Sequence, residues 1–420
     1  MSFNFVFQSI LDFFALYWWI IVPIIFLPLY SSTALFVTHE KRKRENKWVI
    51  LDIKISRETK KTPQAMEQIL ETMNGWGTLP SRKPTEWASL ELISIGGEIH
   101  FMIRILEKYK NLLESTFFSF YQDVDIKEVD DYMDHVPSNT AQLYARDLNV
   151  WGTELILGKE GAYPIKSYKE FTSGGEGKEF DPMSVFTEIM GRLLPDEFLG
   201  VQMILMPIST KSVREKYKPL LEKLKAKPKE GETLDTTTLK LTLGTDAKKV
   251  KVVEENLSKP FFNTLIRAIY VAPRSSFREK YAKQGIVSSF NQYASPDLNS
   301  FKKNSQTEIG DVLPNPDKLF ALFPKSRDEA RKERILHTYR HRDVPPVSAM
   351  GKLISSMFFH TNNASRFVEL STESLATVFH LPTTVVLTAP FMQRVESRKV
   401  GPPQGLAIFG GNEDLEIFET

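Results

Sequence analysis

The chain has 420 residues, and its 54 basic and 52 acidic residues leave a formal net charge of only +2, which argues against a protein that coats nucleic acid. Its 42% of hydrophobic and 25% of charged residues are typical of globular protein, with enough length for two or three domains. The absence of cysteine excludes structural disulfides, thiolate zinc sites and cysteine nucleophiles.

An uncharged, largely apolar run extends from Phe13 to Thr38, directly after Asp12. Because about 20 apolar residues cross the hydrocarbon core of a bilayer, this run predicts a transmembrane helix over residues 13–38. A cleaved signal peptide is the alternative, but residues 1–12 lack the Lys and Arg with which such peptides begin. A helix buried in a soluble core would be shorter. The sequence therefore predicts a single-pass membrane protein.

A basic cluster lies in the predicted juxtamembrane linker, residues 39–47. By the positive-inside rule its four cations face the cytoplasm. We therefore expect residues 1–12 outside the cytoplasmic membrane and the remainder of the chain, to its C-terminus, in the cytoplasm. The same cations are candidate contacts for anionic lipid headgroups. They are Lys41, Arg42, Lys43 and Arg44.

Strand and helix patterns alternate after the linker in the order β-α-β-β-α-β. Gly96-Gly97 between two apolar runs predicts a hairpin, and Thr62-Pro63 predicts the start of a helix. This order is that of a ferredoxin-like domain, which we expect over residues 48–135. The predicted elements are residues 48–55, 63–75, 87–95, 98–106, 109–121 and 124–132.

The same element order recurs over residues 148–310, so the fold class predicted is α+β with two tandem ferredoxin-like domains. Asp181-Pro182 predicts the first helix of this second unit, and an insertion over residues 211–259 separates its middle strands. Arg104 and Arg267 take matching places in the two units. We interpret both as ion-paired residues of the sheet rather than as ligands.

Beyond the second unit we expect a helical segment over residues 326–388 and a Pro/Gly-rich linker with an acidic tail over residues 389–420. A basic helix begins at Ser326. Its cations are candidate contacts for phosphate of nucleic acid or lipid, although a solvated helix or a salt-bridged contact with Asp130-Asp131 is favoured. The candidates are Arg331, Arg334, Arg340 and Arg342.

Motifs for catalysis are not recognisable in the sequence. Gly174–Lys178 is the nearest approach to a phosphate-binding loop, but Glu179 follows where Ser or Thr is needed. His337 and His341 have a spacing that can hold a metal, but the surrounding arginines oppose a cation. We therefore predict no catalytic residues, no cofactor and no metal, and a protein that is not an enzyme.

Several runs occur together in one order: Glu91–Arg104, Tyr163–Tyr168 before Asp181-Pro182, Ile266–Tyr270, and Ser371–Pro382. In this order they resemble the N-terminal, membrane-anchored region of a family of type IV secretion or conjugative DNA-transfer ATPases of small-genome uncultivated bacteria. The resemblance runs from the transmembrane helix to about Pro403, and Leu375–Pro382 is its most specific part.

The resemblance implies a function for the chain. In that family the proline-rich linker leads into a motor domain with a phosphate-binding loop, and we expect this motor to be a separate chain or to have been removed. The expectation is a non-catalytic membrane-anchoring and assembly module of a DNA-transfer machine, homo-oligomeric and docked to a cytoplasmic P-loop ATPase. The alternative is a self-sufficient membrane-tethered protein that binds DNA or anionic lipid.

Overall fold

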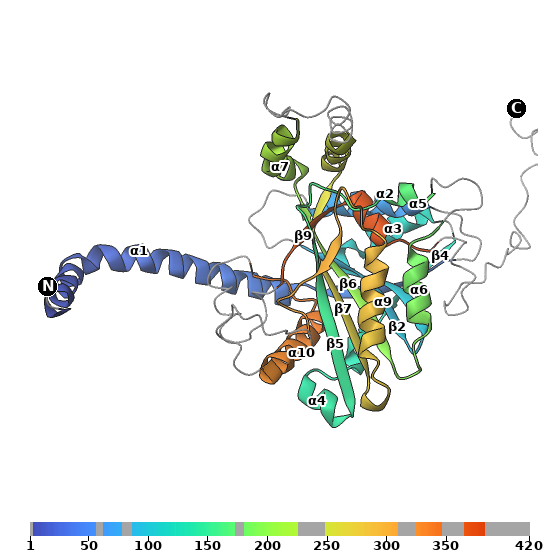
Figure 1. Cartoon of the computed structure of the whole chain (residues 1–420), viewed down its shortest axis with the longest axis horizontal. Helices are drawn as coiled ribbons and strands as arrows, with labels where there is room; N and C mark the ends of the chain where they lie inside the picture. Colours follow the sequence, from blue (N-terminus) through green and yellow to red (C-terminus); the bar gives the residue numbers. More distant parts are fainter. Residues whose placement is uncertain are drawn as a thin grey trace, which may run out of the picture.

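The described chain has one long N-terminal helix and one large antiparallel sheet that is covered by shorter helices (Figure 1). The computed structural model describes residues 3–55, 62–77, 86–121, 123–172, 180–225, 248–309, 324–346 and 365–382. Within these residues the fold is mixed α+β, as predicted.

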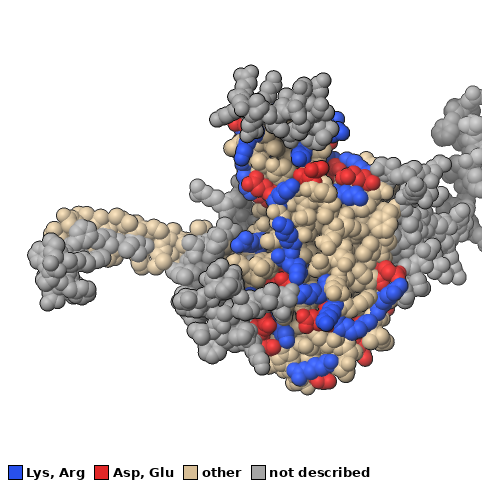
Figure 2. All heavy atoms as spheres, in the orientation of Figure 1, with Lys and Arg blue, Asp and Glu red and all other residues tan. Residues whose placement is uncertain are grey.

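Helix α1 spans Phe3–Glu45, and at about 1.5 Å per residue its 43 residues extend for roughly 65 Å. The window Val22–His39 is long and apolar enough to cross a membrane, and none of it is buried. Figure 2 shows the described part of this helix as an uncharged surface that leads away from the body. The helix includes residues 39–45 of the predicted linker, so that only Asn46 and Lys47 separate it from the first strand.

The described strands form one nine-stranded sheet, in the order β4-β1-β3-β2-β6-β7-β5-β8, with β9 paired to β7. All of its pairs are antiparallel. The strands are β1 Trp48–Ile55, β2 Ala88–Ile95, β3 Glu98–Leu106, β4 Val124–Val129, β5 Leu148–Leu157, β6 Phe198–Ile208, β7 Phe261–Pro273, β8 Phe301–Lys303 and β9 Val368–Ser371.

The two predicted regions meet where β2 pairs with β6, in a register that runs from Ala88↔Leu205 to Ile95↔Phe198. We call this pairing the seam. Every residue of β2 takes part in it, so the strands of both regions belong to one continuous sheet. The predicted hairpin is confirmed: Gly96 and Gly97 have φ of 59° and 93°, as a two-residue turn with both central residues left-handed requires.

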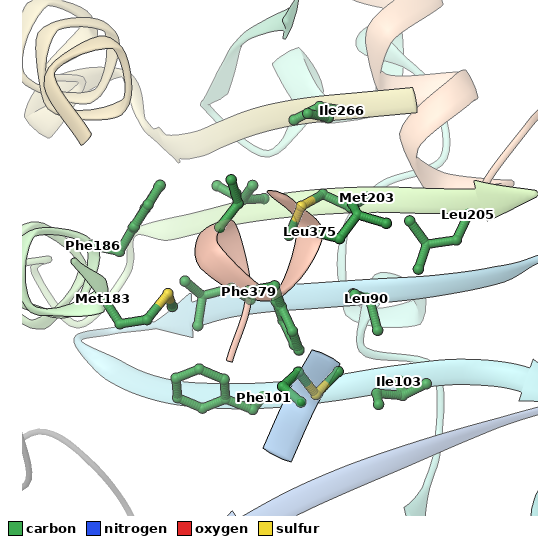
Figure 3. Packing of buried hydrophobic residues seen from close by; sticks show 14 of the residues in the cluster. Leu90, Phe101, Ile103, Met183, Phe186, Met203, Leu205, Ile266, Leu375 and Phe379 are labelled. Atoms are coloured by element: carbon green, nitrogen blue, oxygen red, sulfur yellow. The ribbon is translucent and has the colours of Figure 1, made fainter. Parts of the chain in front are cut away.

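One face of the sheet is covered by helices that bury the largest core. Figure 3 shows Leu375 and Phe379 lying over β6, β2 and β3, beside Met203, Leu90 and Phe101. The last described helix of the chain therefore lies over the seam. The helices on this face are α2 Pro63–Gly77, α3 Lys110–Phe120, α5 Tyr168–Thr172, α6 Met183–Gly191, α9 Glu279–Asn291 and α12 Thr372–Val378.

Shorter elements and one basic helix cover the opposite face, where Leu336 and Tyr339 pack against Ile269 and Phe198. These elements are η2 Tyr132–His135, α4 Thr140–Ala145 and α10 Pro324–Arg340. The short helices η1 Glu107–Tyr109 and η3 Arg274–Ser276 follow β3 and β7.

The insertion between β6 and β7 begins with α7, Thr210–Lys225, and returns through helical residues 248–258. The two helices are joined by an ion pair between Lys225 and Glu254 and by a hydrogen bond of 2.9 Å from Arg214 Nε to the Leu257 carbonyl. The insertion is therefore a helical hairpin where it is described. Residues 226–247, the predicted Gly174–Lys178 loop and the 389–420 tail lie outside the described residues.

Helix α10 lies close to the sheet because Gly200 of β6 has no side chain. A Cβ at Gly200 would lie 2.1 Å from the Tyr339 hydroxyl oxygen and 3.0 Å from the ring. The glycine thus leaves room for a buried tyrosine directly against the backbone of the seam.

We expect Gly200→Ala to destabilise the protein by about 1–3 kcal/mol, since α10 must move to relieve the overlap. Chemical denaturation of the detergent-solubilised full chain measures the change. Gly75→Ala is the matched control, because nothing lies within 4 Å of a Cβ at Gly75. That substitution should be neutral or slightly stabilising in α2. An equal response of the two variants would contradict the packing described.

Candidate functional site at the seam of the sheet

A buried ion pair lies at the seam. Glu91, at the centre of β2, faces Gln202 of β6 in register. Arg342, just after α10, binds its carboxylate with both prongs of the guanidinium: Nε to Oε1 at 3.0 Å and Nη2 to Oε2 at 3.0 Å. The two side chains are 0% and 1% exposed. This is the two-point geometry in which a charge-assisted contact is strongest.

Further donors satisfy the same carboxylate. Ser89 Oγ donates to it at 2.6 Å and the Tyr132 hydroxyl at 2.7 Å. Gln202 donates to it at 3.3 Å from across the seam, and also to the carbonyl of Tyr339 at 3.1 Å. Arg342 also bonds Asp131. The network therefore connects β2, β6, the segment before η2 and the end of α10.

The backbone at Arg342 is unusual, with φ of 49° in the left-handed region. Its N–H donates to the Tyr339 carbonyl, and that of Asp343 donates to Thr338, which is the Schellman arrangement that ends many helices. Glycine normally takes this position, because a side chain there costs about 1–2 kcal/mol. We infer that the bidentate contact with Glu91 offsets this cost.

The electrostatics follow from the burial. Burial alone would raise the pKa of Glu91, but the charge of Arg342 and the hydrogen bonds lower it to about 2. Burial would lower the pKa of Arg342, but the Glu91 carboxylate raises it well above its usual range. Burial, with Glu91 nearby, raises the pKa of Tyr132 and of Tyr339. At neutral pH the site therefore holds one cation (Arg342), one anion (Glu91) and two neutral phenols (Tyr132 and Tyr339).

The polar row continues into the second half of the sheet. Gln202 pairs in register with Arg267, and Arg267 pairs with Glu154 of β5. The Arg267 Nε donates to Glu154 at 3.0 Å in a second buried ion pair. This confirms the interpretation of Arg267.

Arg104 differs from Arg267, its counterpart in the first half. Its guanidinium lies over the rings of Trp48 and Trp87, at 4.6 and 5.2 Å from their centroids. Burial, with Arg342 close by, lowers the pKa of Arg104 to about 10. The interpretation of Arg104 as ion-paired is therefore replaced by a contact with aromatic rings, because the residue opposite it on β1 is Ile50 and not a carboxylate.

The arginines predicted on the basic helix all contact the protein itself. Arg331 donates to the Glu308 carbonyl at 2.7 Å and Arg334 to the Gln306 carbonyl at 3.0 Å. Arg340 donates to the carbonyls of Met133 and Val136, both at 2.6 Å. With Arg342 bound to Asp131, this placement favours the salt-bridged alternative over contact with phosphate. Contact with a phosphate-bearing ligand stays a prediction.

Of the juxtamembrane cations, the side chain of Lys41 is described. It is 78% exposed and lies 4.0 Å from Glu45. Arg42, Lys43 and Arg44 lie on the same helical turns of α1, but their side chains lie outside the description. The two sets of predicted cations are thus at separate places: one at the end of α1, the other against the sheet.

A second buried cluster lies on the other face. His380 Nε2 is 3.0 Å from Asp181 Oδ1, and His380 Nδ1 is 2.8 Å from the Ala376 carbonyl. Asp181 also accepts the N–H of Met183 at 2.8 Å, which confirms its predicted capping role. No local sequence signal indicates the histidine partner, which is 199 residues away. The pair fastens the end of α12 to the start of α6.

In the part of the chain that the structure describes, no three His, Cys, Asp or Glu side chains are grouped so that they could hold a metal ion. The rings of His337 and His341 lie 4.5 Å apart, centroid to centroid. The two buried ion pairs, Glu91–Arg342 at the seam and Arg267–Glu154 between β7 and β5, are closed from solvent, so their direct role is to hold elements together.

Three comparisons bear on identity. A family model described as Domain of unknown function (DUF8128) matches residues 29–315. No curated protein matches the chain. Among solved structures, a berberine bridge enzyme variant described as a reticuline dehydrogenase matches at 10% identity and a TM-score of 0.21, covering 59% of this chain and 42% of that one.

The matched structure is an enzyme, whereas we predicted that this chain is not one, and we withdraw that prediction. The physical reason for the error is that the prediction depended on short motifs, and catalytic groups can be assembled without one. At such a TM-score the match carries no argument about a reaction.

We expect Glu91→Gln to destabilise the full chain by about 3–5 kcal/mol at neutral pH, because Arg342 is left buried without its main anion. The folded-state pKa of Glu91 is about 2, against an ordinary 4.5. The stability from its ionised form is therefore complete above about pH 5 and is lost as the pH falls toward 2. The difference in the free energy of urea unfolding between wild type and Glu91→Gln should therefore decrease as the pH falls from about 5 toward 2.

The matched control is Glu222→Gln, which removes an exposed carboxylate 4.0 Å from Lys218 on α7. This variant should change the free energy of unfolding by no more than about 0.5 kcal/mol at any pH. If the difference in the free energy of unfolding between wild type and Glu91→Gln stays constant from pH 7 to pH 2, Glu91 is not the ionised partner of Arg342 described here.

Proposed function

The chain belongs to the family described as Domain of unknown function (DUF8128), and we propose that it is a membrane-anchoring and assembly module. The family match begins inside α1, at residue 29, and ends at residue 315, beyond β8. The end of the apolar helix and both halves of the sheet therefore fall in the family's shared region. This supports a function that needs the helix and the sheet together.

The observation that carries the proposal is the junction between α1 and β1. Two residues separate the end of the helix at Glu45 from the start of the strand at Trp48. β1 is an interior strand, paired with β3 on one side and β4 on the other. A force on the membrane helix is therefore transmitted to the middle of a sheet half.

We also propose that the two halves are ferredoxin-like units joined edge to edge. The order β4-β1-β3-β2 and the order β8-β5-β7-β6 are the same order for two sets of four strands. In each half the middle strands follow the first helix, and the second helix precedes the last strand. Both are features of the ferredoxin-like arrangement.

The partner proposed is a cytoplasmic P-loop ATPase of a type IV secretion or conjugative DNA-transfer machine, with the chain itself as a homo-oligomer. The resemblance of Leu375–Pro382 and the other runs supports this. Direct DNA binding by α10 is less well supported, because its arginines bind the protein's own carbonyls and carboxylates. On the face shown in Figure 2, basic and acidic side chains are interspersed.

A reporter fused after Thr420 should be active in the cytoplasm. Replacing Lys41, Arg42, Lys43 and Arg44 with Gln should produce a mixed orientation, since four of the five Lys and Arg residues between the span and β1 are then removed. Protease protection of the reporter in spheroplasts measures the fraction on each side. A wild-type reporter on the outer face would overturn both the orientation and the cytoplasmic partner.

Deletion of Gly401–Thr420 should abolish co-purification with a P-loop ATPase encoded beside this chain and leave membrane insertion intact. The reason is that the resembled family places its motor immediately beyond this segment. The control is the variant Arg331→Ala with Arg334→Ala, which should retain the ATPase. The DNA-binding alternative would be favoured by two results together. The deletion would leave co-purification with the ATPase unchanged, and the arginine variant would lose a salt-dependent binding of DNA that the wild type shows.

A further inference from the structure

Aromatic side chains gather where α1 joins the sheet. Three of the chain's six tryptophans are there: Trp48 begins β1, Trp76 lies near the end of α2, and Trp87 directly precedes β2. Trp48 stacks on Trp87 at 4.0 Å between centroids, and Trp76 stacks on Tyr109 at 5.4 Å. We call these four residues the aromatic rim. Trp48, Trp76 and Tyr109 are partly exposed.

Polar contacts connect the two stacks to each other and to the anchor. The Glu86 carboxylate, next to Trp87, accepts from the Tyr109 hydroxyl and from Lys108. The N–H of Glu107 donates to the carbonyl of Lys47, the last residue before β1, at 3.0 Å. The rim is thus a continuous surface at the base of α1.

Chain length limits how far this surface can lie from a bilayer. The apolar window of α1 ends at His39, and the helix ends at Glu45. Six helical rises of about 1.5 Å and three extended residues of about 3.4 Å place Trp48 within roughly 20 Å of that apolar end. The headgroup layer adds roughly 5–8 Å on each side of the hydrocarbon core. This connection is short enough for the rim to lie at the headgroups, and it keeps Trp48 no farther than roughly 15 Å beyond them.

Charge is nearly balanced on this surface. Lys47 lies 4.0 Å from Glu107, Lys108 is paired with Glu86, and Lys110 is paired with Glu128. Attraction to anionic lipid is therefore weak at the rim itself. Tryptophan and tyrosine instead favour the boundary between water and hydrocarbon whatever the headgroup charge, because their rings are apolar with a polar edge.

We propose that the aromatic rim rests in the phospholipid headgroup layer and fixes the sheet with the start of β1 at the membrane. The Gly96–Gly97 hairpin, at the opposite end of β2, then points into the cytoplasm. This proposal rests on the proposed membrane anchoring and adds the face of the soluble body that meets the lipid.

The test uses the cysteine-free full chain in phosphatidylcholine nanodiscs. A fluorophore is attached at Lys108→Cys, beside the rim, or at Ile95→Cys, next to the hairpin. Both positions are exposed, and the seven residue-to-residue steps of β2 from Ala88 to Ile95 separate the two ends by roughly 24 Å. Glu107→Cys is a second position beside the rim, next to Lys47. The quencher is a nitroxide carried on the lipid headgroup.

We expect quenching at Lys108→Cys and Glu107→Cys to exceed that at Ile95→Cys several-fold. The excess should persist when phosphatidylglycerol is added and when salt is raised. Equal quenching at the three positions, stronger quenching at Ile95→Cys, or quenching that requires anionic lipid would overturn the proposal while leaving the anchoring intact. A chain that does not insert into nanodiscs would overturn the anchoring and this proposal together.

Discussion

The bidentate contact between Arg342 and Glu91 is the interaction on which the arrangement of the sheet depends. Removing two such charges from water costs several kcal/mol each, so the pair holds only if every remaining lone pair and proton is satisfied. Ser89, Tyr132 and Asp131 supply the missing partners. Because Gln202 joins from β6, the same network that satisfies the charges also sets the register of the two halves.

The consequence reaches both faces of the sheet. On one face α10 is held by Arg342 and lies against Gly200. On the other, α12 is held by the contact of His380 with Asp181 and by Glu373 with Lys169. The seam is therefore clamped between two helices from the last part of the described chain. Both helices follow strands β1 to β8 in the chain.

Much of the fold was predictable from local patterns. The Gly96-Gly97 turn, the apolar strands and the capping aspartate Asp181 are encoded by neighbouring residues, and each was found. The continuous sheet was not predicted, because strand pairing across a seam depends on residues more than 100 positions apart. A signal was present: β2 and β6 are long and almost uncharged, and an exposed edge of that kind invites pairing. The burial of Arg342 could not be predicted from neighbouring residues for the same reason, since its partner Glu91 is 251 residues away.

The outermost strands have the opposite character. β4 carries Asp125, Lys127 and Glu128, and β8 is three residues long with Lys302 and Lys303. Short, charged edges of this kind resist pairing with a further strand. Once the inner edges have joined, the β4 and β8 edges of the sheet therefore disfavour pairing with a strand from a neighbouring molecule. Contacts between copies of this chain are then favoured through helices and loops, whose contacts can form and separate without breaking a backbone ladder.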